Sequence, residues 1–348
     1  MTDPSAARKT DSMSATWEPT SLDAAQQAVA AVYGLGGAVR RLSSERDETF
    51  LFTRADGTPF VLKIANPAED PAALVFQDGA LLHLEAAAPA VPVPRLVPTL
   101  EGKPSETLST AEGPRIMRLL TFLDGELQYR TPASEAQSRN VGRALAELGL
   151  GLEGYAGRAP EGKLMWDISH TLDLAAVVDH VAPERRPHVE AVLAEFDRSF
   201  PAIGALTRRQ IIHNDFNPHN ILLDPAEPTR VVGIIDFGDM VHAPLVNDLA
   251  VALSYHVATD NWAARIGAFL QGYQSARTLE EAEIELLPLL TRARLAMSII
   301  IAEWRSARFP ENSAYIMRNH ATAWRGLQNT ADLTAAGLKR LVPNLSEA

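Results

Sequence analysis

The sequence predicts an α+β protein with two lobes, an antiparallel-sheet N-terminal lobe and a larger, mainly helical C-terminal lobe. Short β-rich runs separated by turns crowd into the first 121 residues, whereas hydrophobic periodicity beyond residue 135 is mostly helical. The length of 348 residues also exceeds what one hydrophobic core usually serves. We therefore expect an N-terminal lobe over residues 21–121 and a C-terminal lobe over residues 122–348.

The N-terminal lobe is predicted to follow a polar extension. Residues 1–20 are rich in Ser, Thr, Ala and charged residues, which is typical of a disordered extension outside the fold. A helix is expected over residues 22–33, capped by Ser21 and ended by the glycine-rich turn 34–37. A second helix is predicted over 71–88, and strands over 39–43, 49–54, 60–64, 96–99 and 114–120.

The C-terminal lobe is predicted to consist of helices around one β-rich segment. Residues 122–125 form the turn that links the lobes. The β-rich segment spans residues 211–242, where apolar runs alternate with polar and turn-forming residues. Helical periodicity marks residues 135–152, 172–181, 188–200, 248–258, 261–279 and 284–305.

Composition excludes several kinds of chemistry and partner. The chain has no Cys, so disulfides, thiolate nucleophiles and Cys-based metal sites are absent. A formal net charge of -11 gives no general attraction to nucleic acid or to anionic lipid, and we expect neither as a partner. No apolar run is long enough to span a membrane and the first 16 residues do not resemble a signal peptide, so we expect a cytoplasmic location. The oligomeric state is left open.

The polar residues of the β-rich segment indicate phosphoryl transfer. A His-x-Asp-x4-Asn pattern with Asp215 and Asn220 is followed, after the next apolar run, by Asp236 in an Asp-Phe-Gly tripeptide. These three side chains should emerge at the ends of buried strands, where they can converge on one ligand. Phosphoryl transfer needs a proton acceptor for the substrate hydroxyl and oxygen ligands for Mg²⁺. We predict Asp215 as the catalytic base and Asn220 and Asp236 as metal ligands. Asp239 could add a carboxylate nearby.

The motifs resemble those of the aminoglycoside phosphotransferase and choline kinase family, small-molecule kinases with a protein-kinase-like fold, and in particular its hydroxylysine-kinase-like branch. The similarity extends over roughly residues 35–330 and includes 60–64, 165–167, 233–239, 247–250 and 309–315. It implies a kinase that uses ATP or GTP with Mg²⁺ to phosphorylate an amine-bearing alcohol such as hydroxylysine, homoserine or ethanolamine. Two alternatives remain open, an aminoglycoside phosphotransferase and a non-catalytic nucleotide-binding pseudokinase module.

The same resemblance implies roles for further residues. Lys63, in the Val-Leu-Lys-Ile run of the third strand, would contact the α and β phosphates of the nucleotide. His213 would be a structural residue that braces the catalytic loop. The hinge beneath the nucleotide base would be formed by Thr121, Phe122 and Leu123.

Two departures from the family pattern concern the phosphate site. The chain has neither a G-x-G-x-x-G nor a Walker A sequence, so the phosphate-covering turn is expected over residues 43–49. This turn would use backbone N–H groups and the hydroxyls of Ser43 and Ser44. The Glu that normally pairs with the strand lysine has no convincing counterpart. The helix over 71–88 offers Gln77, Asp78 and Glu85.

Residues for the acceptor pocket have two interpretations each. Trp166 and Asp167 could line the pocket, or they could be a core aromatic residue and a helix N-cap. Glu303 and Trp304 could cage an ammonium group, or they could belong to ordinary helix packing. Asp248 could be a helix-terminal carboxylate or could hold the metal loop. Arginines late in the chain favour an acceptor with a carboxylate as well as an amine: Arg292, Arg294, Arg305, Arg308 and Arg318.

Overall fold

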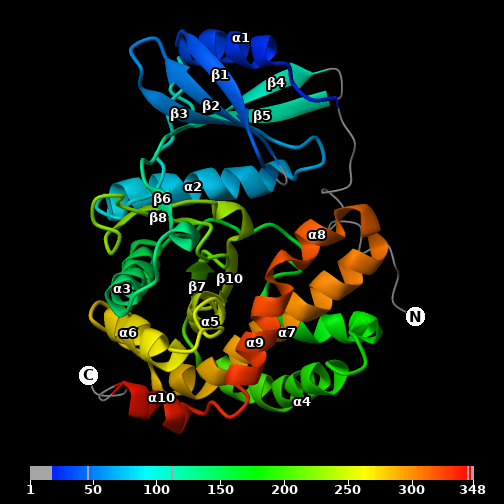
Figure 1. The fold of residues 1–348 in the computed structure, drawn as a ribbon. Helices are drawn as coiled ribbons and strands as arrows, with labels where there is room; N and C mark the ends of the chain where they lie inside the picture. The colour runs from blue at the N-terminus through cyan, green and yellow to red at the C-terminus, as the bar shows by residue number, and fades with distance from the viewer. Residues whose placement is uncertain (1–17, 45–46, 111–112, 343–344, 346–348) are drawn as a thin grey trace. The chain divides into compact units, whose positions relative to one another are not determined.

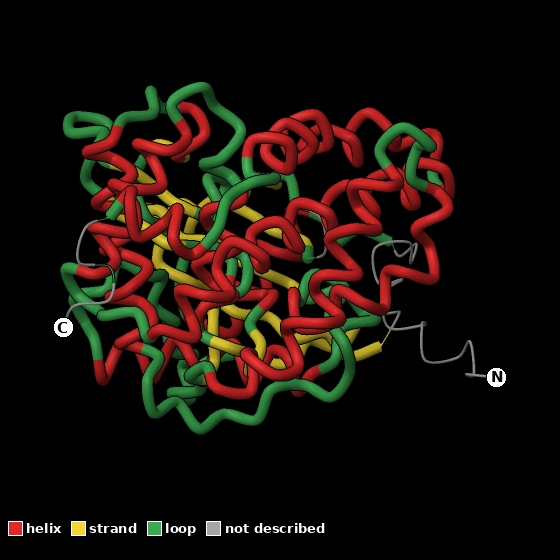
Figure 2. Tube along the Cα trace, turned by 90° about the horizontal axis from the view of Figure 1, so that it is seen from below, coloured by secondary structure: helices red, strands yellow, loops and turns green. Residues whose placement is uncertain are grey.

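The computed structural model describes residues 18–44, 47–110, 113–342 and 345, and it forms two compact units (Figure 1). The first unit ends at Asp124 and also contains Ala156–Gly162, and the rest of the chain belongs to the second. One unit carries a five-stranded antiparallel sheet, and helices make up most of the other. Figure 2 shows the helices of the chain in red and its strands in yellow. The predicted α+β class is thereby confirmed. Residues 1–17 of the expected extension lie outside the described residues.

The first unit is an antiparallel sheet with a helix on each face (Figure 1). Its strands pair in the order β1-β2-β3-β5-β4. Helix α1 packs against a core of strand residues that includes Phe50, Leu62 and Met117. The opposite face of the sheet carries Lys63 and Arg118, and Arg118 hydrogen-bonds side chains of helix α2. The elements are α1 (Leu22–Tyr33), β1 (Gly37–Leu42), β2 (Glu48–Arg54), β3 (Pro59–Ile64), α2 (Pro71–Ala87), β4 (Glu106–Thr110) and β5 (Gly113–Thr121).

The prediction of a strand over residues 96–99 is wrong. This segment contributes a single bridge between Leu96 and Leu120, because Pro98 has no N–H to continue a ladder and Thr99 turns back to bond Lys103. The edge of the sheet is instead β4, which pairs with β5 through five residue pairs.

The second unit combines short strands with α-helices and shorter 3₁₀ segments. Its strands form a pair, β10-β7, and a group of three, β6-β8-β9. The strands are β6 (Glu126–Leu127), β7 (Arg209–Ile212), β8 (Ile221–Leu223), β9 (Val231–Ile234) and β10 (Val241–Pro244). The α-helices are α3 (Glu135–Gly151), α4 (Arg186–Ile203), α5 (Val246–Ser254), α6 (Trp262–Gln274), α7 (Glu281–Arg308), α8 (Ser313–Ile316), α9 (His320–Asn329) and α10 (Ala335–Leu341). The 3₁₀ turns are η2 (Gln128–Arg130), η3 (Ile168–His180), η4 (Gly204–Leu206), η5 (Phe237–Asp239), η6 (Pro310–Asn312) and η7 (Met317–Asn319).

Helix α7 is the centre of the second unit. Nearly all of its residues from Glu283 to Ala302 are buried, and it packs against α4, α5, α9 and η3. The segment predicted as a helix over 172–181 belongs to the 3₁₀ segment η3, and the helices α9 and α10 were not predicted. Among the described residues, no helix is long and apolar enough to cross a membrane.

Glycines set how closely α3 and α6 approach. A Cβ atom at Gly142 would lie 2.0 Å from the carbonyl oxygen of Phe269, and one at Gly272 would lie 1.8 Å from that of Arg139. No side chain fits at either position, so the two helix backbones can touch only through glycine.

Candidate functional site

The loop between β7 and β8 fixes the carboxylate of Asp215. Asn217 donates from Nδ2 to Asp215 Oδ1 at 2.8 Å, and Asn220 donates from Nδ2 to Asp215 Oδ2 at 2.7 Å. Both amide side chains are almost fully buried. Each carboxylate oxygen is therefore held by one amide, which orients Asp215 while leaving it further acceptor capacity.

His213 links this loop to the strand that precedes Asp236. Its Nε2 lies 3.1 Å from the carbonyl oxygen of Ile235, and its Nδ1 lies 3.3 Å from the backbone N of Asp215. Burial lowers the pKa of His213, so the ring is neutral, with Nε2–H donating to Ile235 and Nδ1 accepting from Asp215. A backbone bond of 2.9 Å from Ile235 N to the oxygen of Asn220 joins the same segments.

Asp248 holds the start of the loop from helix α5. Its two carboxylate oxygens accept from the backbone N–H groups of His213 at 3.0 Å and Asn214 at 2.6 Å. Burial raises the pKa of Asp248 to about 7, although both hydrogen bonds favour the charged form. Asp248 lies in the first turn of α5, whose N-cap is Leu245, so it is a helix-terminal carboxylate, as one of its two interpretations predicted. From this position its side chain bonds the loop that begins at His213.

Asp236 precedes the single 3₁₀ turn η5 after β9, and Asp239 is the last residue of that turn. Asp236 has φ 67° and ψ 76°, a left-handed conformation that is uncommon for a residue other than glycine and often found at functional sites. Phe237 packs its ring against His213, with centroids 4.9 Å apart. The negative charges of Asp239 and Asp236 act on Asp215, whose pKa is raised to about 7, chiefly by burial. The structure thus brings together Asp215 and both later aspartates, as well as Asn220.

These residues have the donor set that Mg²⁺ uses with phosphate. Asn220 directs its amide nitrogen to Asp215, which leaves the amide oxygen as the end suited to a cation. In the described part of the chain, no group of three or more His, Asp or Glu side chains is placed to hold a metal ion by itself. Mg²⁺ is commonly held by one or two protein oxygens together with phosphate and water oxygens, so the residues fit an ion that arrives with a nucleotide.

In the first unit, Arg118, the arginine opposite Lys63, binds Asp78 of α2. Lys63 on β3 pairs with Arg118 on β5. Arg118 donates from Nη1 to Asp78 Oδ1 at 2.8 Å and from Nη2 to Gln77 Oε1 at 2.7 Å, and all three side chains are buried. Of the three residues considered as partners for Lys63, two therefore bond Arg118, and the third, Glu85, is exposed.

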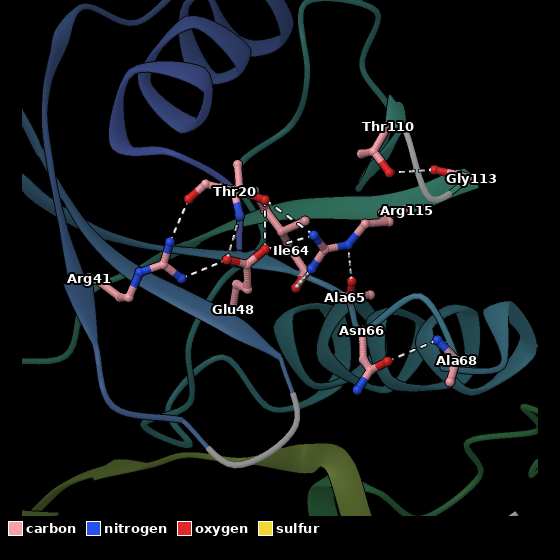
Figure 3. Close-up of polar contacts among 10 residues, drawn as sticks. All are labelled: Thr20, Arg41, Glu48, Ile64, Ala65, Asn66, Ala68, Thr110, Gly113 and Arg115. Atoms are coloured by element: carbon pink, nitrogen blue, oxygen red, sulfur yellow. Dashed lines mark hydrogen bonds and ion pairs between the residues drawn. The ribbon is translucent and has the colours of Figure 1, made fainter. Parts of the chain in front are cut away.

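A second arginine of β5 anchors the end of the predicted phosphate-covering turn (Figure 3). Arg115 donates to Glu48 Oε2 at 2.7 Å and to the carbonyl oxygen of Ala65 at 2.6 Å, two residues beyond Lys63. Thr20 donates its backbone N–H and its hydroxyl to the same carboxylate, at 2.9 and 2.6 Å. Thr20 is therefore part of the fold, which corrects the prediction that the extension continues to residue 20.

The other nucleotide-site candidates lie at strand ends of the first unit. Ser43 and Ser44 follow β1 and are exposed. Thr121 is the last residue of β5, and its hydroxyl accepts from the backbone N–H of Arg95 at 2.9 Å. Phe122 and Leu123 follow it, with 39% of Phe122 exposed, which leaves an aromatic surface at this position.

The acceptor candidates differ in how their side chains are used. Asp167 caps the helical segment η3 by accepting from Ser169 N at 2.8 Å, and Trp166 packs beneath a guanidinium. Glu303 uses both carboxylate oxygens within the protein, accepting from Ala182 N at 2.7 Å and bonding His320 Nε2 at 2.6 Å. This geometry favours the helix-packing interpretation of Glu303, and Trp304, beside it on α7, is half-buried.

Sequence reasoning missed two residues that contact Asp215. Asn217 lies inside the motif, and its amide at two residues from the aspartate was a signal that could have been used. Arg294 lies 79 positions away on α7, and its Nη2 is 3.6 Å from Asp215 Oδ1. Nothing in the local sequence of α7 indicates that contact.

Comparison with known proteins supports the same chemistry. A sequence model described as the phosphotransferase enzyme family matches residues 38–286. Hydroxylysine kinase of Danio rerio is 28% identical over 322 residues, covering 88% of this chain and 89% of that protein. Homoserine kinase of Agrobacterium fabrum is 30% identical over 258 residues, covering 71% and 73% respectively.

Solved structures share the fold. A microcompartment-associated aminopropanol kinase gives a TM-score of 0.63 at 20% identity, covering 94% of this chain and 100% of that one. An aminoglycoside phosphotransferase from Alicyclobacillus acidocaldarius gives 0.62 at 18% identity, covering 94% and 96%. The predicted protein-kinase-like fold is confirmed by these neighbours. The chain therefore belongs to the phosphotransferase enzyme family, as a kinase that phosphorylates a hydroxyl group of a small molecule.

Proposed function

We propose that this kinase transfers the γ-phosphate of ATP or GTP, with Mg²⁺, to the hydroxyl of an amine-bearing metabolite, with Asp215 as the catalytic base. The observation that carries the proposal is the fixed carboxylate of Asp215, which Asn217 and Asn220 hold by one oxygen each. A base for phosphoryl transfer must be oriented toward the attacking hydroxyl, because this chemistry depends on positioning and charge neutralisation.

The reaction assigns one task to each residue. The acceptor oxygen attacks the γ-phosphorus, the bond to the β-phosphate oxygen breaks, and the hydroxyl proton moves to Asp215. A pKa near 7 suits a group that must accept this proton at neutral pH. Asn220 and Asp236 would hold Mg²⁺, which would supply positive charge at the phosphates. Lys63 would contact the α and β phosphates, and Thr121 to Leu123 would lie beneath the base.

The acceptor is proposed to be a hydroxylated amino acid, with an amino alcohol as the next choice. Relatives named hydroxylysine kinase and homoserine kinase match this chain over 67–92% of its length. Both names denote amino acids with a side-chain hydroxyl. The solved aminoglycoside phosphotransferase is only 18% identical and supports the fold alone, so an aminoglycoside ranks below these acceptors.

A purified-enzyme assay tests the proposal. The protein is incubated with Mg²⁺ and ATP or GTP against hydroxylysine, homoserine, ethanolamine, choline and kanamycin, and nucleoside diphosphate release is measured. We expect turnover with one amine-bearing alcohol, loss of turnover in Asp215→Asn by a factor of about 10³ or more, and retained nucleotide binding. Asp197→Asn, an exposed position on α4, is the matched control.

Two results would count against the proposal. Nucleotide binding without turnover of any acceptor favours a non-catalytic nucleotide-binding module. Equal activity of wild type and Asp215→Asn would remove Asp215 as the base. Removal of the metal with EDTA should stop turnover, and restoration by Mg²⁺ in preference to Ca²⁺ would identify the ion.

A further inference from the structure

Tyr129 lies beside the loop that carries Asp215, although it belongs to a different segment of the second unit. Strand β6 pairs antiparallel with β8, with Leu127 opposite Leu222. The residues that follow β6 therefore run beside the residues that precede β8, which are the last residues of the loop. In this position the backbone N–H of Tyr129 donates to the carbonyl oxygen of Pro218 at 3.1 Å.

The ring of Tyr129 packs on the imidazole ring of His219. The two ring centres are 4.3 Å apart and the planes are inclined by 34°, which is the range of attractive aromatic pairs. Arg130 also holds Tyr129, because its Nε donates to the Tyr129 hydroxyl at 2.8 Å and its guanidinium lies 5.2 Å from the ring centre. Tyr129 is nevertheless 47% exposed. Its ring therefore adds little to the buried core of the unit.

His219 connects this contact to the carboxylate of Asp215 through Asn217. The backbone N–H of His219 donates to Asn217 Oδ1 at 2.8 Å. Because this bond occupies the oxygen end of the amide, the nitrogen end faces Asp215 Oδ1, to which it donates at 2.8 Å. A reversed amide would place its oxygen against the carboxylate and would lose both bonds. The backbone position of His219 therefore sets the direction of the Asn217 amide, and through it that of the Asp215 carboxylate.

We propose that Tyr129 is a positioning residue for the catalytic base, and that it acts through His219 and Asn217. The inference rests on the proposed role of Asp215 in proton transfer. Phosphoryl transfer depends on such placement, since a displacement of about 1 Å can reduce the rate by about 10²-fold. Because the ring of Tyr129 is half-exposed, its loss should reduce the rate of the reaction far more than the stability of the fold.

The test removes the ring and keeps the backbone bond to Pro218. Tyr129→Leu removes the aromatic ring, Tyr129→Phe keeps the ring without the hydroxyl, and Leu150→Ala, at a 41% exposed position on α3, is the control. For each full-length protein, kcat and the KM of the acceptor are measured with Mg²⁺ and nucleotide, together with the melting temperature. His219→Ala, alone and combined with Tyr129→Leu, tests the route through His219.

The expected result is a loss of rate in one variant. Tyr129→Leu should lower kcat by about 10-fold or more, with the KM of the acceptor within about twofold of wild type. Its melting temperature should stay within about 3 °C of wild type. Tyr129→Phe and Leu150→Ala should keep the wild-type kcat. In the His219→Ala background, Tyr129→Leu should have little further effect, because both changes remove the same contact.

A second measurement needs no turnover. In the two-dimensional proton–nitrogen NMR spectrum, the side-chain amide of Asn217 is identified by its disappearance in Asn217→Asp. Its signals should shift in Tyr129→Leu and stay in place in Tyr129→Phe and Leu150→Ala, because only the first change releases His219.

Three outcomes would overturn the positioning role. They are a wild-type kcat in Tyr129→Leu, an equally large loss of kcat in Tyr129→Phe, and an Asn217 amide whose signals do not move in Tyr129→Leu. Failure of the proposed function has a different signature. In that case the amide signals shift as expected, which supports the route from Tyr129 to Asp215, while wild type phosphorylates no acceptor.

Discussion

The loop that carries Asp215 is held in part by the buried carboxylate of Asp248, and removal of that carboxylate gives a quantitative prediction. In Asp248→Ala, the backbone N–H groups of His213 and Asn214 lose their acceptor. Both residues are 0% exposed, so solvent does not replace the lost bonds. Asn214 also holds φ 63°, a conformation that a residue other than glycine keeps only when its surroundings enforce it.

The magnitude follows from the two bonds. Each unsatisfied buried donor costs about 1–3 kcal/mol, so Asp248→Ala should lower the free energy of unfolding by about 2–6 kcal/mol. Asp248→Asn keeps one acceptor oxygen and should lose about half as much. Urea unfolding at pH 7.5 measures both values, and an unchanged slope against urea confirms that stability, not compactness, has changed. Turnover by folded Asp248→Asn should fall, because the position of Asp215 follows that of the loop.

The control is Asp197→Ala, an exposed carboxylate on α4, for which a change within about 0.5 kcal/mol is expected. If Asp248→Ala destabilises no more than this control, the two hydrogen bonds do not hold the loop. If Asp248→Asn is fully stable and fully active, one acceptor oxygen suffices, and the argument that two bonds position Asp215 is refuted.

Two further predictions concern other buried charges. Arg118→Met removes the cation that pairs with buried Asp78 and should destabilise the protein by about 3–5 kcal/mol. Asp78→Asn in the same background should recover much of that loss. If the two changes in unfolding free energy, measured with urea, are strictly additive, the pair is not coupled. Burial lowers the pKa of His256 to about 3, below its value in the unfolded chain, so its contribution to stability is complete above about pH 6.5 and is lost as the pH falls. Wild type should therefore lose about 1–2 kcal/mol more than His256→Gln between pH 6.5 and pH 5, and parallel stability profiles of the two proteins would contradict the assignment.

Local sequence signals predict most of the sheet and helices but not their edges. The helix over 22–33 matches α1 because its start and end are both encoded locally, by the hydroxyl of Ser21 and by a glycine that adopts φ 66°. The edge strand of the sheet cannot be predicted from local signals in the same way. Residues 96–99 and 106–110 are both short and β-compatible, and which one pairs with β5 depends on the missing N–H of Pro98 and on packing.

For the candidate site, the sequence predicts the side chains that a motif contains and misses those that come from distant elements. Asp215 and Asn220 are five residues apart, and their contact follows from the turn between two strands. Two other neighbours come from residues far away in the sequence. Arg118 is 55 positions after Lys63 and lies opposite it because of the strand register. Arg294 is 79 positions after Asp215 and lies near it because of how helix α7 packs.

The bonds around Asp215 divide into two kinds, and this division has consequences for function. Asp248 and His213 bond backbone atoms, and they determine where the loop lies. Asn217 and Asn220 bond the carboxylate itself, and they determine where its oxygens point. Loss of a backbone anchor should therefore reduce stability and turnover together. Loss of the Asn217 amide should instead reduce turnover in a protein of nearly normal stability, because Asp215 keeps its place in the chain while its carboxylate gains rotational freedom.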